Sequence, residues 1–148
     1  MVERQVSNRV GRIDYSEYAD LLSAIKHVYL VGDLQEPTPH PFMRDDRVEF
    51  VLCYYKAGDD GEYHWHPHVT EYEIVVEGEI GYFEVATSQL HWFHGGDVCI
   101  IPAGVCVKRL VLQPARTVAV KVPSRNDKVY CAACPRECSC RVTPYQEG

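Results

Sequence analysis

The chain has 148 residues, of which 46% are hydrophobic and 24% are charged, and its net charge is -6. This composition is typical of one soluble globular domain and excludes a largely disordered or fibrous chain. The negative charge argues against a dedicated nucleic-acid-binding protein, because no sequence-wide basic field exists to hold phosphate backbones. No stretch reaches the roughly 20 apolar residues of a membrane span, and the first residues lack the apolar core of a signal peptide. We therefore expect a cytosolic protein that binds a small molecule, without a nucleic-acid or membrane partner.

The region before residue 45 combines a helical pattern with a proline-rich segment. Residues 14–26 place four apolar side chains at the spacing of one helix face, and Ser16 is available as an N-cap. We expect a short amphipathic helix here. Residues 36–41 contain three prolines, each of which removes a backbone donor and favours extended geometry in the preceding residue. This segment is expected to be a loop that leads into the main core.

From Val48 onward the pattern changes to short runs rich in β-branched and aromatic residues, most of them separated by Gly, Pro, Asp or Asn. The runs cover residues 48–56, 72–76, 80–85, 98–101, 105–112 and 118–122. Several short strands at close spacing are typical of an antiparallel sandwich or barrel, so we expect an all-β core. The composition changes again from Val129, and this cysteine-rich tail is expected to lie outside the barrel.

A candidate metal site lies in the segment from Gly58 to Glu71. Residues two apart in a strand project from the same face, so His64 and His66 can converge on one ion, and Glu71 from the next strand can complete the set. Two imidazoles and one carboxylate leave coordination positions open, an arrangement associated with non-haem iron and able to serve other metals. The alternative is a pair of surface histidines on a polar loop.

The wider spacing resembles two known motifs. Glycine, five residues, His-x-His, four residues, glutamate, six residues and glycine is the first signature motif of the cupin superfamily, filled here by Gly58, His64, His66, Glu71 and Gly78. A second stretch resembles the opening of the second cupin motif, with Gly96 followed after five residues by Pro102-Ala103-Gly104. The resemblance covers about residues 45–122.

This resemblance implies an antiparallel jelly-roll β-barrel, with His64, His66 and Glu71 pointing into its mouth. It also implies a homodimer. We expect a single domain made of an N-terminal helix and lead-in loop (1–44), the cupin barrel (45–123) and a C-terminal cysteine-rich appendage (124–148). The resemblance implies a divalent metal in the barrel, with Fe(II) favoured and Zn, Mn or Ni as alternatives.

The sequence departs from the second motif where a histidine ligand would stand, because this position holds Val107. Cys106 and Lys108 flank it, but strand alternation points both away from the face that Val107 occupies. Three interpretations remain open. The centre has three ligands with water or substrate in the vacant position, or it recruits another histidine, or it no longer holds metal. The candidate replacements are His68, His91 and His94.

Two further residues are candidates for a catalytic role. Glu73 shares strand parity with Glu71, and a second carboxylate beside a metal can act as a general acid or base. Its alternative role is to hydrogen-bond a ligand. Arg109 shares parity with Val107 and can clamp a substrate carboxylate or phosphate. Its alternative role is an ion pair with Glu73 or another acid.

The chain has seven cysteines. Three lie singly in apolar runs and are expected to be small buried residues: Cys53, Cys99 and Cys106. The other four are clustered: Cys131, Cys134, Cys138 and Cys140. Four thiolates this close can bind a structural Zn or Fe ion, which would order a tail too polar to fold alone. The alternatives are an iron-sulfur cluster and a tail without metal, whose cysteines stay reduced or become oxidised on isolation.

The sequence thus predicts a metal-dependent enzyme acting on a small polar or aromatic molecule. The two-His, one-carboxylate set favours an oxidoreductase of the non-haem iron dioxygenase type. A redox-neutral isomerase or lyase for a sugar or keto acid is the second hypothesis, with Glu73 moving protons. A non-catalytic module that binds or senses a small ligand is the third, and the missing fourth histidine supports it.

Overall fold

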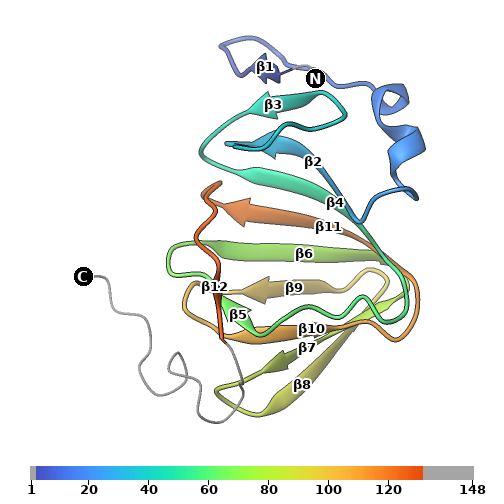
Figure 1. Ribbon diagram of the computed structural model, residues 1–148, viewed down its shortest axis with the longest axis vertical. Coiled ribbons are helices and arrows are strands. Elements are labelled where there is room, and N and C mark those ends of the chain that lie inside the picture. Colours follow the sequence, from blue (N-terminus) through green and yellow to red (C-terminus); the bar gives the residue numbers. More distant parts are fainter. Residues whose placement is uncertain (1–2, 132–148) are drawn as a thin grey trace.

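The computed structural model describes residues 3–131, which form two β-sheets (Figure 1). The large sheet contains, in spatial order, β1 (Glu3–Gln5), β3 (Phe42–Arg44), β2 (His27–Gly32), β4 (Glu49–Tyr55), β11 (Ala115–Val122), β6 (Thr70–Glu77) and β9 (Val98–Ile101). The small sheet contains β12 (Val129–Tyr130), β5 (His64–Trp65), β10 (Val107–Leu110), β7 (Glu79–Glu84) and β8 (Gln89–His94). The two pairings made by β3 are parallel, and the others are antiparallel.

The main core lies between the two sheets. It contains buried side chains of β4, β6, β9 and β11 from the large sheet and of β7 and β10 from the small one, including Val51, Val75, Ile80 and Val107. The predicted all-β core is therefore confirmed. The predicted barrel is not closed, because no hydrogen-bonded ladder joins the two sheets within residues 3–131.

A tight turn joins β6 to β7 and connects the two sheets. Gly78 alone separates these strands, and its φ is +83°. A Cβ atom at this position would lie 2.2 Å from the Pro114 carbonyl oxygen. Glycine is required here both for the positive φ and for the close approach of the neighbouring backbone.

The predicted helix over residues 14–26 is wrong. This segment forms two short 3-10 turns, Tyr15–Glu17 and Ala19–Leu21, and its N-cap is Asp14 instead of Ser16. The Asp14 backbone N–H donates to the Glu17 carboxylate, which is also held by Arg4. Tyr18 lies between the turns with φ near -142°, which is outside the helical region and interrupts any continuous helix.

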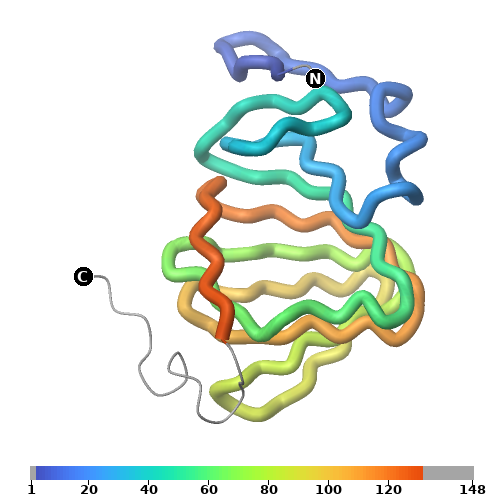
Figure 2. Tube along the Cα trace, in the orientation of Figure 1, coloured from blue at the N-terminus to red at the C-terminus, as the bar shows by residue number. Residues whose placement is uncertain are grey.

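The C-terminal part of the described chain is integrated into the small sheet. After β11 the backbone crosses to the other sheet and pairs there as β12 (Figure 2). In this pairing Tyr130 lies opposite His64 and Val129 lies opposite Trp65. The expectation that the chain from Val129 lies outside the barrel is thus wrong for its first two residues, which pair with the histidine-bearing strand in the small sheet.

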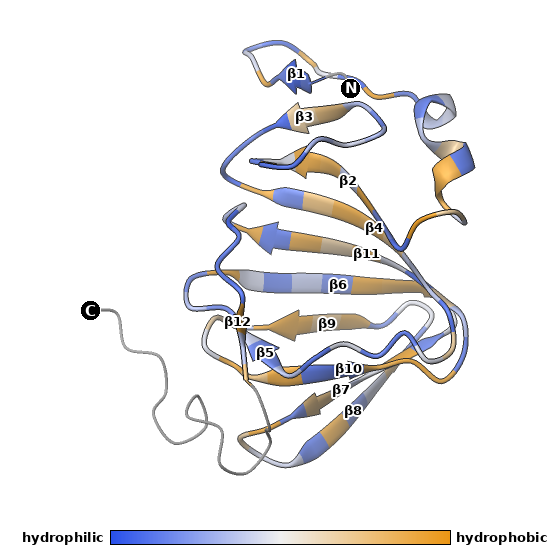
Figure 3. Cartoon of the chain, in the orientation of Figure 1, coloured by the Kyte–Doolittle hydropathy of each residue, from blue (hydrophilic) through white to orange (hydrophobic). Residues whose placement is uncertain are grey.

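The outer surface of the large sheet is apolar over four adjacent strands. Its rows run across β4, β11, β6 and β9, and β9 is apolar along its length (Figure 3). One row is Phe50, Val120, Tyr72 and Ile100, and the next is Leu52, Val118, Ile74 and Val98. Val98 is 60% exposed and Ile100 is 57% exposed. We refer to these eight residues as the outer face.

Candidate metal centre

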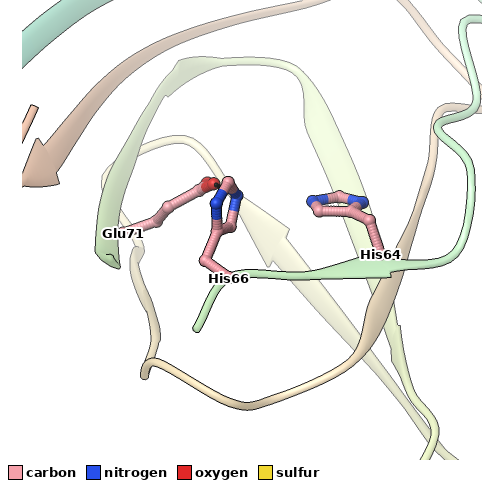
Figure 4. A group of neighbouring side chains, drawn as sticks. All are labelled: His64, His66 and Glu71. Carbon is pink, nitrogen blue, oxygen red and sulfur yellow. Dashed lines mark ion pairs between the residues drawn. The ribbon is translucent and has the colours of Figure 1, made fainter. Parts of the chain in front are cut away.

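Strand pairing and a short loop bring the three predicted ligands together (Figure 4). His64 lies on β5, His66 follows that strand directly, and Glu71 lies near the start of β6. One ligand atom from each side chain lies within 4.8 Å of the other two. The Gly104 backbone N–H donates to the His66 carbonyl at 2.8 Å, so the loop of the second motif fixes the backbone of a residue of the first.

Each histidine is oriented by a partner on its Nδ1 atom. His64 Nδ1 donates to the Glu62 carbonyl at 2.8 Å, and His66 Nδ1 donates to Asp127 Oδ1 at 2.8 Å. These bonds leave the Nε2 lone pairs for the centre, as is usual for metal-binding histidines. The second Asp127 oxygen accepts from the His68 backbone N–H at 2.7 Å, which locks the carboxylate in place.

The Nε2 atom of His66 tests whether these residues fit a metal ion. This atom is buried and lies 2.8 Å from Glu71 Oε1. It makes no hydrogen bond of acceptable geometry to any residue in the described part of the chain. A buried nitrogen without a hydrogen bond is costly, and a cation shared by the nitrogen and the carboxylate would satisfy both. The donor set therefore fits a divalent ion.

Electrostatics keeps two of the ligands, His64 and Glu71, in their metal-binding protonation states. Burial lowers the pKa of His64 to about 4. Burial alone would raise the pKa of Glu71, but the adjacent His66 and the positive charge of Lys121 outweigh it and lower this pKa to about 2. At neutral pH the centre thus presents a neutral His64 and an ionised Glu71.

Lys121 is a neighbour of the centre that the sequence interpretation missed. On β11 it stands opposite Glu71 of β6 and Glu49 of β4. Its Nζ atom lies 3.4 Å from Glu49 Oε2, and the two carboxylates raise its pKa although burial opposes this. The sequence signal that could have identified Lys121 is a lysine at an inward-facing position of an otherwise apolar strand. Asp127 was missed too, and no local pattern marks it.

Glu73 faces inward, as predicted, and lines the same small cavity as His64 and Glu71. It is only 3% exposed and accepts hydrogen bonds from the hydroxyls of Tyr82 and Thr117. Burial is the main reason that its pKa is raised. The catalytic role of Glu73 stays a prediction.

Arg109 also lines this cavity, but it is held by its neighbours. Its guanidinium lies 4.1 Å from the Tyr55 ring centroid and donates to the Asp59 carbonyl at 3.1 Å. Within residues 3–131 it makes no ion pair with Glu73. Its proposed clamp role stays a prediction.

The position of the absent fourth ligand is apolar. Val107 is buried in the main core and stands opposite His64 in the β10–β5 ladder. Its neighbours point the other way, as alternation predicts: Lys108 packs over the Tyr63 ring, and Cys106 belongs to a second apolar cluster.

The alternative histidines lie outside the group. His91 Nε2 lies 2.9 Å from Glu84 Oε1, His94 pairs with Glu79, and His68 Nδ1 lies 3.6 Å from Asp127 Oδ2. This arrangement favours a three-ligand centre over a rearranged one.

Two neighbouring cavities serve the centre. The inner one has a volume of about 60 Å³ and is lined by His64, Glu71 and Glu73, among others. The outer one has a volume of about 400 Å³ and is bounded by residues 33–40, which include the predicted proline-rich loop. Four residues line both cavities: His27, Tyr29, Lys121 and Lys128. The site is thus a small inner cavity next to a larger outer one, and we refer to the boundary that these four residues share as the passage.

Only one residue of the predicted cysteine site is described. Cys131 N donates to the Tyr63 carbonyl, and Cys131 Sγ lies 3.4 Å from Cys106 Sγ. Cys53, Cys99 and Cys106 are buried, as predicted, but Cys106 faces another thiol. The other three cysteines of the predicted site lie outside the described residues: Cys134, Cys138 and Cys140.

Comparison with known proteins identifies the fold. No family model and no curated protein matches the chain. An uncharacterized conserved protein with a double-stranded β-helix domain from Klebsiella pneumoniae is 20% identical, with a TM-score of 0.53 over 58% of this chain and 71% of that chain. An RmlC-like cupin from Shewanella frigidimarina is 20% identical, with a TM-score of 0.50 over 56% of this chain and 72% of that chain.

This chain has the cupin fold. The motif resemblance is thereby confirmed at the level of the fold, with the two motifs on strands and turns that meet at one site. A mutant of the oxalate decarboxylase OxdC from Bacillus subtilis also matches, at 18% identity and a TM-score of 0.51, over 57% of this chain and 24% of that chain. No helix in residues 3–131 is long and apolar enough to cross a membrane.

Proposed function

We propose that this protein is a metal-dependent cupin enzyme in which His64, His66 and Glu71 bind a divalent ion. The observation that carries the proposal is the buried His66 Nε2 atom, which faces the Glu71 carboxylate without a hydrogen bond while Asp127 fixes the other side of the ring. Such an arrangement is expected of an oriented metal ligand. The substrate in this proposal is a small polar or aromatic molecule that enters from the outer cavity.

The residues around the centre have different roles in this proposal. A bound ion would supply Lewis acidity and, as Fe(II), a site for dioxygen chemistry. Val107 contributes no donor atom, so a coordination position of a bound ion would stay open for substrate. Lys121 balances the charge of Glu71, and Tyr55 with Tyr82 forms part of the inner wall. Residues 33–40 narrow the entrance and limit access of bulk water.

The first reaction type we propose is that of a non-haem iron dioxygenase. It is supported by the two-His, one-carboxylate donor set with open positions. After anaerobic reconstitution with Fe(II), oxygen uptake should rise with at least one compound in a screen of small acids and phenols. The matched His64→Ala/Glu71→Ala variant should show no such rise. A screen without any substrate-dependent uptake would reject the dioxygenase.

A redox-neutral isomerase or lyase for a sugar or keto acid is the alternative reaction. Its specific support is the position of Glu73, a buried carboxylate on the wall of the inner cavity beside the ligands. There it can take a proton from a carbon atom next to a carbonyl group. Turnover under strict anaerobiosis that is lost in Glu73→Gln would select this alternative, whereas turnover that needs oxygen would eliminate it.

A non-catalytic ligand-binding or sensing cupin is supported by the apolar residue at the fourth-ligand position, Val107. This protein would bind its ligand without turnover. Tight binding that survives Glu71→Ala would favour this function, since a metal-centred enzyme should lose binding or activity with that change.

Metal analysis of the full chain tests the proposed metal centre, to which all three candidate functions refer. Mass spectrometry of tag-free protein prepared without chelators should find an ion that disappears in His64→Ala/Glu71→Ala. We further propose a structural Zn or Fe ion at the C-terminal cysteines. This ion should disappear on truncation after Cys131, whereas the ion proposed at His64, His66 and Glu71 should remain. Unchanged metal content in the histidine variant would refute the proposed centre.

A further inference from the structure

The passage between the two cavities contains a cation without an anionic partner. Lys121 and Lys128 both line the inner and the outer cavity. Lys121 is paired with Glu49 and stands opposite Glu71 in the sheet. Lys128 makes no ion pair with any carboxylate in residues 3–131. Of the two ammonium groups at this passage, one is therefore neutralised and the other is not.

The fold holds Lys128 beside the centre. It directly precedes β12, whose Tyr130 lies opposite His64 in the ladder, and its Nζ atom lies 5.6 Å from the Tyr130 ring centroid. The preceding residue, Asp127, orients His66 through its carboxylate. One short segment thus carries both the residue that positions a metal ligand and the unpaired ammonium group. Figure 2 shows this segment crossing from the large sheet to the small one.

The charges that line the inner cavity favour an anion. Its cations are Arg109, Lys121 and Lys128, and its carboxylates are Glu71 and Glu73. The pKa of Lys128 is lowered by burial and by the charges of Lys121 and Arg109, which Glu71 and Glu49 offset only in part, so an anion beside Lys128 would stabilise its charged form. In the outer cavity, Asp33 is already paired with Arg44 and Glu49 with Lys121. A divalent ion at the centre would add further positive charge.

The size of the inner cavity restricts the end of the ligand that enters it. A volume of about 60 Å³ admits a group of a few non-hydrogen atoms, such as a hydroxyl or carbonyl group on a short carbon chain, but not an aromatic ring. The remainder of the molecule has about 400 Å³ in the outer cavity. A ligand that spans the passage must therefore carry a small polar end.

We propose that the substrate is a small organic acid whose carboxylate is bound by Lys128 while its other polar end enters the inner cavity beside His64 and Glu71. This inference rests on the proposed metal centre and narrows its substrate class. It moves the anion-binding role from Arg109, which is held by Asp59 and Tyr55, to a residue in the segment after the last long strand.

Calorimetric titration of the metal-loaded full chain tests the proposal. The probes are malonate, lactate and pyruvate, each compared with its uncharged amide, and inorganic phosphate as a different anion. At least one acid should bind at millimolar concentrations, and its amide should not. Lys128→Gln should weaken this binding about tenfold or more, because a charge-assisted contact is lost. Lys108→Gln is the matched control, since Lys108, like Lys128, lies over a tyrosine ring but lines neither cavity, and it should leave binding unchanged.

The outcomes separate this inference from the metal centre. Lys128→Gln should retain the full metal content. If metal is retained but the acids bind wild type and Lys128→Gln equally, or bind no better than their amides, the carboxylate site is refuted and the metal centre stands. Absence of binding by all three acids, or Lys128-dependent binding of phosphate alone, also refutes it. If His64→Ala/Glu71→Ala leaves the metal content unchanged, the centre itself fails.

Discussion

Asp127→Asn is the sharpest test of how the centre is built. The Asp127 carboxylate accepts two N–H groups, one from His66 Nδ1 at 2.8 Å and one from the His68 backbone at 2.7 Å. Asparagine has one acceptor oxygen and presents N–H groups on the other side, so one of the two donors must lose its partner. Loss of a hydrogen bond to a charged group costs about 1.5–3 kcal/mol. If this energy orients His66, metal affinity should fall about 10–100-fold.

Competition between the protein and a chromophoric chelator for Zn²⁺ or Co²⁺ measures this affinity. The chain supplies a matched control in Asp97, whose carboxylate accepts the His94 backbone N–H at 2.8 Å and lies 3.6 Å from the His94 ring, away from the centre. Asp97→Asn should leave affinity unchanged. Thermal unfolding of the metal-free proteins separates loss of orientation from loss of fold. A folded Asp127→Asn protein with wild-type affinity would refute the orienting role.

Three further predictions use other parts of the structure. Val107→His places a ligand opposite His64 in the ladder. It should raise metal affinity at least about tenfold in the chelator competition described above. Unchanged affinity would mean that this position does not face the ion. Burial, assisted by Arg109 and other charges, lowers the pKa of His27 from 6.5 to about 4, so the unfolded chain binds more protons between these values. His27 should therefore account for a loss of up to about 3 kcal/mol in the stability of the metal-free protein as pH falls through this window, in addition to the loss from His64, and urea titrations of His27→Phe should show a smaller total loss; equal losses would contradict this. Finally, we propose that the outer face forms a homodimer, because five of its eight residues are at least 40% exposed, and a contiguous exposed apolar patch marks a site of association. Ile74→Lys should then give a monomer by light scattering, and a wild-type protein that is already monomeric would refute the dimer.

The strands that sequence could predict are those with continuous apolar or alternating patterns. β9 has the predicted bounds of residues 98–101, and β4, β6, β7, β10 and β11 overlap the predicted runs. The strands β5 and β12 have two residues each, too few for any periodicity, and they exist because each supplies the other with a partner. The helical spacing in residues 14–26 was misleading, because side-chain contacts of Asp14, Glu17 and Arg4 favour a tight turn instead.

In the candidate site, too, some features follow from local sequence patterns and others depend on contacts between distant parts of the chain. His64, His66 and Glu71 lie within eight consecutive residues, so their convergence could be predicted from strand geometry and motif spacing. Asp127 is 61 residues from His66, and the contact depends on the crossing of the segment after β11. No local pattern encodes such a contact. The residues that orient the ligands and the cation at the passage therefore became visible only with the fold.

The proposed determinants of function lie in two different parts of the chain. The donor atoms come from the first motif, where the spacing of the residues is tightly constrained by the strands. The orientation of His66 and part of the charge at the entrance come from residues 124–130, an irregular segment that ends in a two-residue strand. Substitutions in this segment can alter ligand choice without touching the donor set, because Lys128 contributes charge to the cavities and no bond to the ligands. Reaction type and substrate class are thus separable by mutation: variants of Glu71 or Glu73 should change the chemistry, and variants of Lys128 should change which acids bind.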